Sequence, residues 1–355
     1  MKVLIECYYL NNFGDDLILA SFIQNTNFED YYIIGDEKRR GNDKIFGEKV
    51  KFISYKKSLF SSNEFDQFII IGGSMFQEVT GWNKRIWRLR ILSKIFKLLN
   101  KKNYITGINY GPYKTKKFLN ETKKLFRNFD GISVRDNNSY KILKEMKINN
   151  IGLYPDTALA FKKNRLFNNS EEELKNVIGL SIINSPEISN EKEYINKMGG
   201  IIKKIIAKGN HVKLFSFQSS DPYNDTKVID KIYDLLDNKE KMFVKIVQYE
   251  SNNFEQFLFE FDQCYLIIGS RLHSIILSII FNKKVVPVIY SDKTVEFLNY
   301  IEFNNKLTPL YVEKVSEWSV ENIIINIEKI DYSDVSEYKN LNEWINESKK
   351  HYNYV

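Results

Sequence analysis

Short apolar segments alternate with longer amphipathic segments along the chain, in two successive rounds. The run Phe68-Ile69-Ile70-Ile71 has no polar face, as expected for a strand covered by helices on both sides. Alternation of this kind favours parallel, doubly wound sheets. In the first half, the pattern predicts strands at 2–7, 31–34, 68–71, 104–108, 131–134 and 151–154, and helices at 15–25, 84–100, 116–127 and 136–146.

The second half repeats this order. It predicts strands at 177–183, 211–217, 243–248, 265–268 and 285–290, and helices at 191–208, 225–236, 253–262 and 271–281. The polar segment 162–176 is typical of a linker, and a chain of 355 residues favours two domains. We therefore expect an α/β protein with two Rossmann-like domains, 1–165 and 175–330, that face a cleft lined by the carboxyl ends of both sheets. A helix and an exposed tail should follow at 331–355.

Composition and charge narrow the classes of function. Apolar residues make up 43% of the chain and charged residues 27%, which is typical of a globular domain. A net charge of +7 permits an anionic partner but does not indicate nucleic acid. Glu6 interrupts any signal-peptide core, and Cys7 and Cys264 fall in or beside predicted buried strands. We therefore expect a cytoplasmic protein without a disulfide framework.

The loops that follow the predicted strands carry the candidate chemistry. Most of them combine a turn-forming residue with a polar or charged one, and none matches a Walker loop or the GxGxxG pattern. The segment Gly269–Ser274, "GSRLHS", places Arg271 and His273 where a helix should begin. Free backbone N–H groups at a helix start favour anions, and a guanidinium can bind carboxylate or phosphate through two parallel hydrogen bonds.

Six of these segments together resemble the polysaccharide pyruvyl transferase family. The resemblance implies a two-domain fold like that of the GT-B glycosyltransferases. It also implies transfer of the pyruvyl group from phosphoenolpyruvate to a sugar, with a cyclic ketal as product and no further cofactor. The segments Asp221–Asp262 and the last 50 or so residues match no recognisable pattern. The matching segments are "NNFGDD", "IIGGSMFQE", "GINYGP", "SVRDNNSYKIL", "YPDTALAF" and "IIGSRLHSIILSIIFNKKVVPVIYSDK".

The resemblance gives Arg271 and His273 catalytic roles. Phosphoenolpyruvate is anionic, so Arg271 would bind it, and Arg135 could supply a second cation. Ketal formation needs a proton on the methylene carbon of the donor, and a histidine with an ordinary pKa near 6.5 can give and take protons at neutral pH. Of the other two histidines, His211 begins a predicted strand and His351 lies in the predicted tail.

The remaining site residues are expected at the same sheet edges. The N-terminal domain would take the acceptor and the C-terminal domain the donor. As alternatives, Asn12 and Asp15 only cap the first helix, Arg135 pairs with Asp136, and Asp156 only shapes a turn. No His, Cys or Asp cluster has metal-ligand spacing, so we expect no bound metal. The expected donor-binding residues are Arg135, Ser270, Arg271 and Leu272; the expected acceptor or cleft residues are Asn12, Gly14, Asp15, Gly73, Ser74, Asn109, Asp156 and Lys293.

A basic amphipathic segment suggests a further partner. From Val79 to Asn120 there are eleven Lys or Arg residues and no Asp or Glu. A helix at 84–102 could lie on an anionic membrane surface, where a lipid-linked oligosaccharide acceptor would be met. The alternative is that its apolar stripe packs on the sheet. That stripe consists of Ile86, Trp87, Ile91, Ile95, Leu98 and Leu99.

Two other functions fit the same pattern. In a nucleotide-sugar glycosyltransferase of this architecture, Arg271 and Arg135 would hold a diphosphate. In a non-catalytic glycan-binding protein, neither Arg271 nor His273 would be required.

Overall fold

The structure is a computed structural model that describes residues 1–8, 11–35, 47, 49–163, 176–303, 309–329, 338 and 340–353. They form two parallel sheets with helices, so the predicted α/β class is confirmed. The predicted linker, 162–176, lies almost entirely outside the described residues. The chain divides into two compact units: unit 1 is Met1–Leu10, Asp15–Lys162 and Glu343–Val355, and unit 2 is Asn11–Gly14 and Lys163–Asn342.

Unit 1 contains a seven-stranded sheet in the order β3-β2-β1-β4-β5-β6-β7. The six strands predicted in this half are present, whereas β3 was not predicted because its short sequence, VKFI, includes an exposed lysine. Strand β1 pairs with both β2 and β4, so the strand order reverses there. Ligands of open α/β sheets bind beyond the carboxyl ends at such a point. The strands are β1 Lys2–Glu6, β2 Asp30–Ile34, β3 Val50–Ile53, β4 Gln67–Phe76, β5 Lys102–Tyr110, β6 Gly131–Val134 and β7 Ile151–Leu153.

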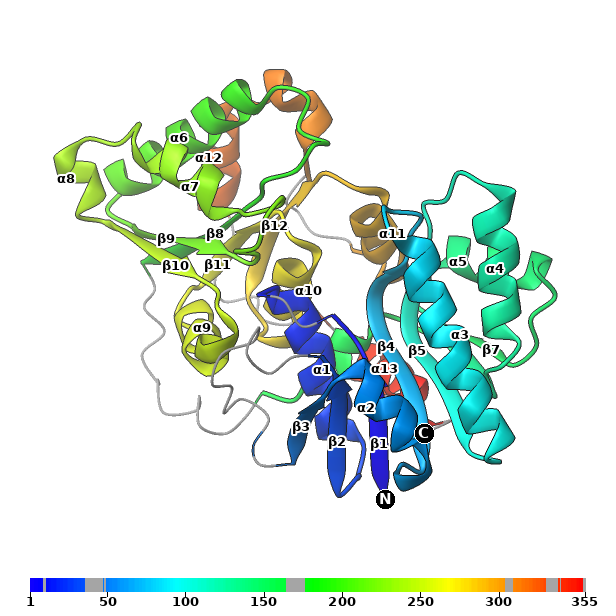
Figure 1. The fold of residues 1–355 in the computed structure, drawn as a ribbon. Coiled ribbons are helices and arrows are strands. Elements are labelled where there is room, and N and C mark those ends of the chain that lie inside the picture. Colours follow the sequence, from blue (N-terminus) through cyan, green and yellow to red (C-terminus); the bar gives the residue numbers. More distant parts are fainter. Residues whose placement is uncertain are drawn as a thin grey trace. The chain divides into compact units, whose positions relative to one another are not determined.

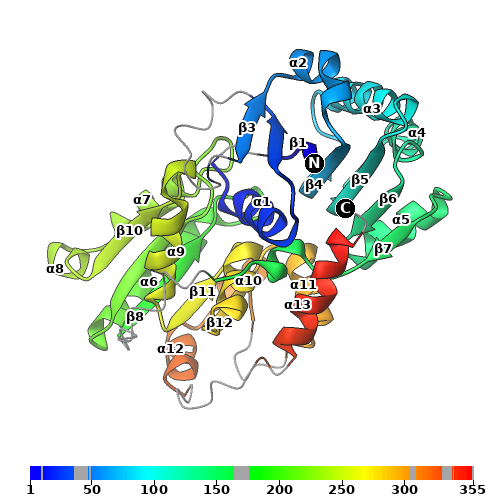
Figure 2. The ribbon, with the colours of Figure 1, turned by 90° about the horizontal axis from the view of Figure 1, so that it is seen from below.

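Helices cover both faces of this sheet. Figure 2 shows α2, α3 and α4 along one face and α1 and α13 along the other. Helix α3 packs on the sheet through Leu89, Leu92 and Phe96, which recur at helical spacing and are almost fully buried. The helices are α1 Phe13–Asn25, α2 Tyr55–Phe60, α3 Trp82–Leu98, α4 Lys116–Phe126, α5 Asn137–Glu145 and α13 Leu341–Lys349.

Unit 2 contains a six-stranded sheet in the order β10-β9-β8-β11-β12-β13. Helices α6, α7 and α12 lie along one face, and α9 and α10 along the other (Figure 1). Helices α8, α11 and α12 and strand β13 were not predicted. The strands are β8 Val177–Ile182, β9 His211–Ser216, β10 Val244–Gln248, β11 Leu266–Gly269, β12 Lys284–Ile289 and β13 Leu310–Tyr311. The helices are α6 Glu191–Ala207, α7 Thr226–Tyr233, α8 Asn238–Lys241, α9 Phe254–Asp262, α10 Leu272–Ile280, α11 Asp292–Tyr300 and α12 Val320–Glu328.

Within the described C-terminal residues, His351 and Tyr352 are buried, so the prediction of an exposed tail is wrong for them. His351 is 0% exposed. Its Nε2 lies 2.8 Å from the carbonyl oxygen of Pro155, and its Nδ1 lies 2.7 Å from Ser133 Oγ. Because a carbonyl oxygen can only accept, Nε2 carries the proton and Nδ1 accepts from the serine hydroxyl. A neutral imidazole satisfies both contacts, and burial lowers the pKa of His351 to about 4.

We predict that His351→Gln removes part of the pH dependence of stability. The pKa of this histidine is 6.5 in the unfolded chain and about 4 in the folded protein, so as the pH falls the unfolded chain is protonated at residue 351 before the folded protein is. The wild type should therefore lose about 2 kcal/mol of unfolding free energy between pH 7 and pH 5 through this group alone. Urea denaturation should show that the difference in unfolding free energy between wild type and variant is smaller by that amount at pH 5 than at pH 7. His211→Gln, on an exposed residue, is the control; a constant difference would contradict a neutral His351.

Candidate functional site

The candidate site in unit 2 lies where β8, β9, β11 and β12 end. Arg271 follows β11 and occupies the N-cap position of α10 in an extended conformation. The apolar sequence of α10, LHSIILSII, is buried from Ser274 to Ile279, which fixes the start of the helix at the end of the strand. The backbone N–H of Ser274 donates to the Arg271 carbonyl oxygen at 2.8 Å. The first N–H groups of a helix and its positive dipole end favour an anion at such a position.

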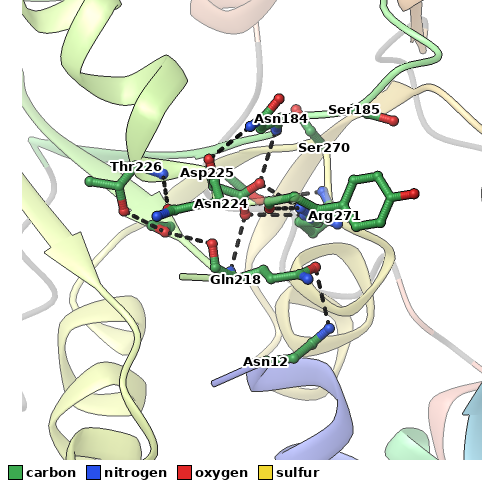
Figure 3. Close-up of polar contacts among 12 residues, drawn as sticks. Asn12, Asn184, Ser185, Gln218, Asn224, Asp225, Thr226, Ser270 and Arg271 are labelled. Atoms are coloured by element: carbon green, nitrogen blue, oxygen red, sulfur yellow. Dashed lines mark hydrogen bonds and ion pairs between the residues drawn. The ribbon is translucent and has the colours of Figure 1, made fainter. Parts of the chain in front are cut away.

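Arg271 is held by a buried carboxylate, Asp225 (Figure 3). Its Nε donates to one carboxylate oxygen at 3.1 Å and its Nη2 donates to the other. Asp225 also accepts the backbone N–H groups of Asn184 at 2.9 Å and Gln218 at 3.1 Å. The carboxylate therefore joins the residues that follow β8, β9 and β11, and it fixes the plane of the guanidinium.

The charges of this pair are coupled. Burial raises the pKa of Asp225, whereas Arg271 and the two backbone N–H donors act in the opposite direction. Burial disfavours the Arg271 cation, but Asp225 and the Tyr290 side chain raise the pKa of the guanidinium overall. Arg271 thus stays charged, and its side chain remains 17% exposed. A fixed, partly exposed cation at a helix start is suited to an anionic ligand.

His273 lies in the first turn of α10, against Gly14. A Cβ at Gly14 would stand 2.0 Å from His273 Nδ1, which no side chain can tolerate. The absence of a Cβ at Gly14 therefore leaves the space that the His273 ring occupies, and this closeness was not expected from the sequence. The segment Asn11–Gly14 belongs to unit 2, although α1 continues in unit 1.

The other residues of unit 2 that the sequence analysis placed in the site are Asn12, Ser270, Leu272 and Lys293, and they differ in burial and contacts. Asn12 caps α1, because its side-chain oxygen accepts from the Gly14 N–H at 2.9 Å. Its amide nitrogen also lies 3.4 Å from Gln218 Oε1. Ser270, the residue before Arg271, is fully buried. Its backbone N–H donates to the carbonyl oxygen of Ser181 at 3.2 Å and so fixes the end of β11. Leu272 and Lys293 are half-buried in the first turns of α10 and α11.

Unit 1 carries a second polar cluster at the carboxyl ends of its strands. Arg135, which follows β6, donates to Asp156 and, at 2.9 Å, to Asn109 Oδ1. Ser74 donates to the same Asn109 oxygen at 3.1 Å. The Arg135 and Asp156 side chains are only 8% and 3% exposed. The partner of Arg135 is therefore Asp156, whereas Asp136 caps α5.

Two further predicted residues of unit 1 approach each other. Gly73 has a φ of 68°, which favours glycine, and a Cβ there would lie 3.0 Å from Asp15 Oδ1.

Asp156 also caps a short 3-10 helix by accepting the N–H of Ala158 at 2.9 Å, so its predicted role in the turn and its ion pair with Arg135 coexist. Within the described part of the chain, no three His, Cys, Asp or Glu side chains gather as a metal site.

Sequence reasoning missed Asp225 and Glu6. Asp225 lies in the stretch 221–262, where the sequence analysis recognised no motif, and its proximity to Arg271 in the fold reveals it. Glu6 ends β1, and burial raises its pKa to about 7, against the opposing charges of Arg85 and Arg88. A carboxyl group that titrates near neutrality at the end of a strand is a candidate acid or base.

Comparison with solved structures places the chain in the GT-B class. The UDP-GlcNAc 2-epimerase of Methanocaldococcus jannaschii matches with a TM-score of 0.63 and 14% identity, over 100% of this chain and 99% of that one. Anabaena HepE, solved with UDP and glucose, gives 0.59 at 10% identity and covers 100% of both chains. ADP-heptose LPS heptosyltransferase II of E. coli gives 0.54 at 10% identity, over 92% of this chain and 98% of that one. These likenesses show the fold alone.

The family model for polysaccharide pyruvyl transferase matches residues 12–292. The chain therefore belongs to the polysaccharide pyruvyl transferase family, as predicted. The amylovoran biosynthesis protein AmsJ of Erwinia amylovora is 26% identical over 313 residues, which are 80% of this chain and 72% of AmsJ. The matched span includes Arg135, Asp225, Arg271 and His273.

We predict that Gly14→Ala displaces His273. The added methyl group would overlap the imidazole, and overpacking of this kind typically costs about 1–3 kcal/mol of unfolding free energy. Urea denaturation and the NMR signals of His273 would report both effects. Gly200→Ala is the matched control, because a Cβ there meets Val320 at an ordinary 3.4 Å within α6. Equal stability of the two variants and an unmoved His273 signal would refute the contact.

Proposed function

We propose that the protein transfers the pyruvyl group of phosphoenolpyruvate onto a sugar of a polysaccharide or of its lipid-linked precursor. The products would be a pyruvate ketal and phosphate. The observation that carries the proposal is the start of α10, where a charged, oriented Arg271 and His273 are separated by one residue. Membership of the pyruvyl transferase family supports the same reaction.

Arg271 would bind the donor through the part of the guanidinium that stays exposed. Asp225 takes Nε and Nη2, Nη2 also donates to the carbonyl oxygen of Tyr223 at 3.2 Å, and the Tyr290 side chain bonds the guanidinium as well. The side chain nevertheless remains 17% exposed, and a carboxylate or phosphate oxygen would meet it there. The N–H groups at the start of α10 would add further donors. Because Asp225 fixes the guanidinium plane before the ligand arrives, less conformational entropy is lost on binding. In unit 1, Arg135 is the proposed second cation for the donor, held in place by Asp156 and Asn109.

His273 would move the proton that the chemistry requires. The protonated imidazole gives its proton to the methylene carbon of phosphoenolpyruvate, and the carbon that bears the phosphate becomes oxocarbenium-like. A sugar hydroxyl attacks that carbon and returns its proton to His273. Phosphate leaves with the carbon–oxygen bond electrons, a second hydroxyl closes the ketal, and its proton ends on phosphate. General acid–base catalysis of this kind typically contributes about 10²–10⁴-fold to the rate.

The competing function is transfer of a sugar from a nucleotide-sugar. The fold favours it, since solved structures of this fold include enzymes named for UDP-GlcNAc and ADP-heptose. A thermal-shift experiment with phosphoenolpyruvate and a nucleotide-sugar panel separates the two donors. The decisive assay incubates the protein with phosphoenolpyruvate and galactoside, mannoside and hexosamine acceptors. Released phosphate and an acceptor that gains the mass of a pyruvyl ketal would support the proposal; stabilisation by nucleotide-sugars alone would overturn it.

Loss of Arg271 should weaken both folding and donor binding. Arg271→Ala leaves the buried Asp225 carboxylate without its cation, which typically costs about 3–5 kcal/mol of unfolding free energy. The double variant Arg271→Met with Asp225→Asn removes both charges and keeps a side-chain oxygen that can accept from a backbone N–H, so it should recover much of that stability. It should still fail to bind phosphoenolpyruvate in calorimetry. If the double variant binds the donor normally, Arg271 only stabilises unit 2.

His273→Asn should separate binding from turnover. Asparagine keeps a similar size and some hydrogen bonding but cannot carry a proton at neutral pH. We expect nearly unchanged phosphoenolpyruvate binding by calorimetry and phosphate release slowed by roughly 10²–10⁴-fold. His211→Asn, at the exposed start of β9, should leave both unchanged. Normal turnover by His273→Asn would exclude His273 as the acid.

A further inference from the structure

Helix α3 presents apolar side chains on the side opposite its buried face. Trp87 is 55% exposed and Leu98 is 82% exposed. The face that packs on the sheet consists instead of Leu89, Leu92 and Phe96, about half a turn of the helix away. Of the predicted stripe of six apolar residues, only Ile86 is buried. The alternative that this stripe packs on the sheet is therefore wrong.

The exposed apolar side is surrounded by positive charge. Lys84 and Lys94 are exposed and lie on the same side of the helix as Trp87 and Leu98, at spacings of three, four and seven residues. No acidic residue occurs between Val79 and Asn120 in the sequence. The arginines of the helix are engaged elsewhere: Arg90, for example, pairs with Glu121. The lysines are thus the cations that this surface offers to a partner.

A cavity of 330 Å³ opens beside this surface, at the start of α3 and α4. Two indole rings and several cations line it, together with the carboxylate that pairs with Arg90. Indoles with nearby ammonium groups match the boundary between lipid headgroups and acyl chains. The lining includes Trp82, Lys84, Trp87, Arg90, Lys117 and Glu121.

We propose that this face of α3 docks on an anionic membrane surface. Trp87 and Leu98 would enter the headgroup boundary, Lys84 and Lys94 would contact lipid phosphates, and the cavity would take a headgroup. No helix in the described ranges is both long and apolar enough to cross a membrane. A second copy of the chain is the less favourable occupant, because two such basic faces repel each other. The proposal does not depend on which donor the protein uses.

Vesicle flotation tests the proposal with the full chain. Vesicles of phosphatidylcholine with phosphatidylglycerol should bind the protein, and high salt should weaken the binding because it screens the attraction. Vesicles of phosphatidylcholine alone should bind it far less. Lys84→Gln with Lys94→Gln should reduce affinity for anionic vesicles on the order of tenfold. Trp87→Ser with Leu98→Ser should reduce it as well, with unchanged melting temperatures.

A matched control uses a second exposed helix, α8 in unit 2. Lys239 and Met242 are both exposed there, and Met242 is 81% exposed. Lys239→Gln with Met242→Ser should leave vesicle binding unchanged. Equal binding to neutral and anionic vesicles, binding to neither, or an equal loss in the α8 variant would overturn the proposal. The proposal would also be overturned if the wild type eluted as a dimer in size-exclusion chromatography and the Trp87→Ser, Leu98→Ser variant eluted as a monomer, since a second copy would then cover this face.

Discussion

The buried pair of Asp225 and Arg271 is the interaction on which the candidate site of unit 2 depends. Burying a carboxylate and a guanidinium costs several kcal/mol each, and only close, well-hydrogen-bonded pairing offsets that cost. Asp225 meets the requirement with two bonds to Arg271 and two from backbone N–H groups. Those partners follow β8, β9 and β11, which are neighbours in the sheet, so the full set of bonds forms only when these three strands are paired. Correct folding and correct placement of the cation are therefore one event.

Unit 1 uses the same device with different parts. Arg135 and Asp156 are almost buried together, and Asn109 accepts from both Arg135 and Ser74. The C-terminal segment supports this cluster, because Ser348 donates to the carbonyl oxygen of Asp156 at 2.8 Å. Residues more than 190 positions apart in the chain thus hold one loop in place. A C-terminal truncation would remove these contacts from the strand ends rather than merely shorten a tail.

Much of the fold could be predicted from the sequence because buried parallel strands are nearly continuous apolar runs. Strands such as Phe68–Ile71 stand out for that reason, and helix α10 follows from its apolar length. The tail could not be predicted, since "KKHYNYV" is polar as a sequence and His351 is buried only through its contacts with Ser133 and Pro155. Asp225 was equally invisible. Its loop has ordinary turn residues, and nothing local distinguishes a buried carboxylate from an exposed one.

Of the candidate site, the sequence indicated the residue types better than their partners. Arg271 and His273 were found from their position between a strand and a helix, and Arg135 from a similar position. The role of Gly14 follows only from the fold, because its neighbour His273 lies 259 positions later in the chain. Residues that bear charge can be recognised singly. Residues that supply space or a counter-ion are defined by what they touch, and that information exists only once distant segments have come together.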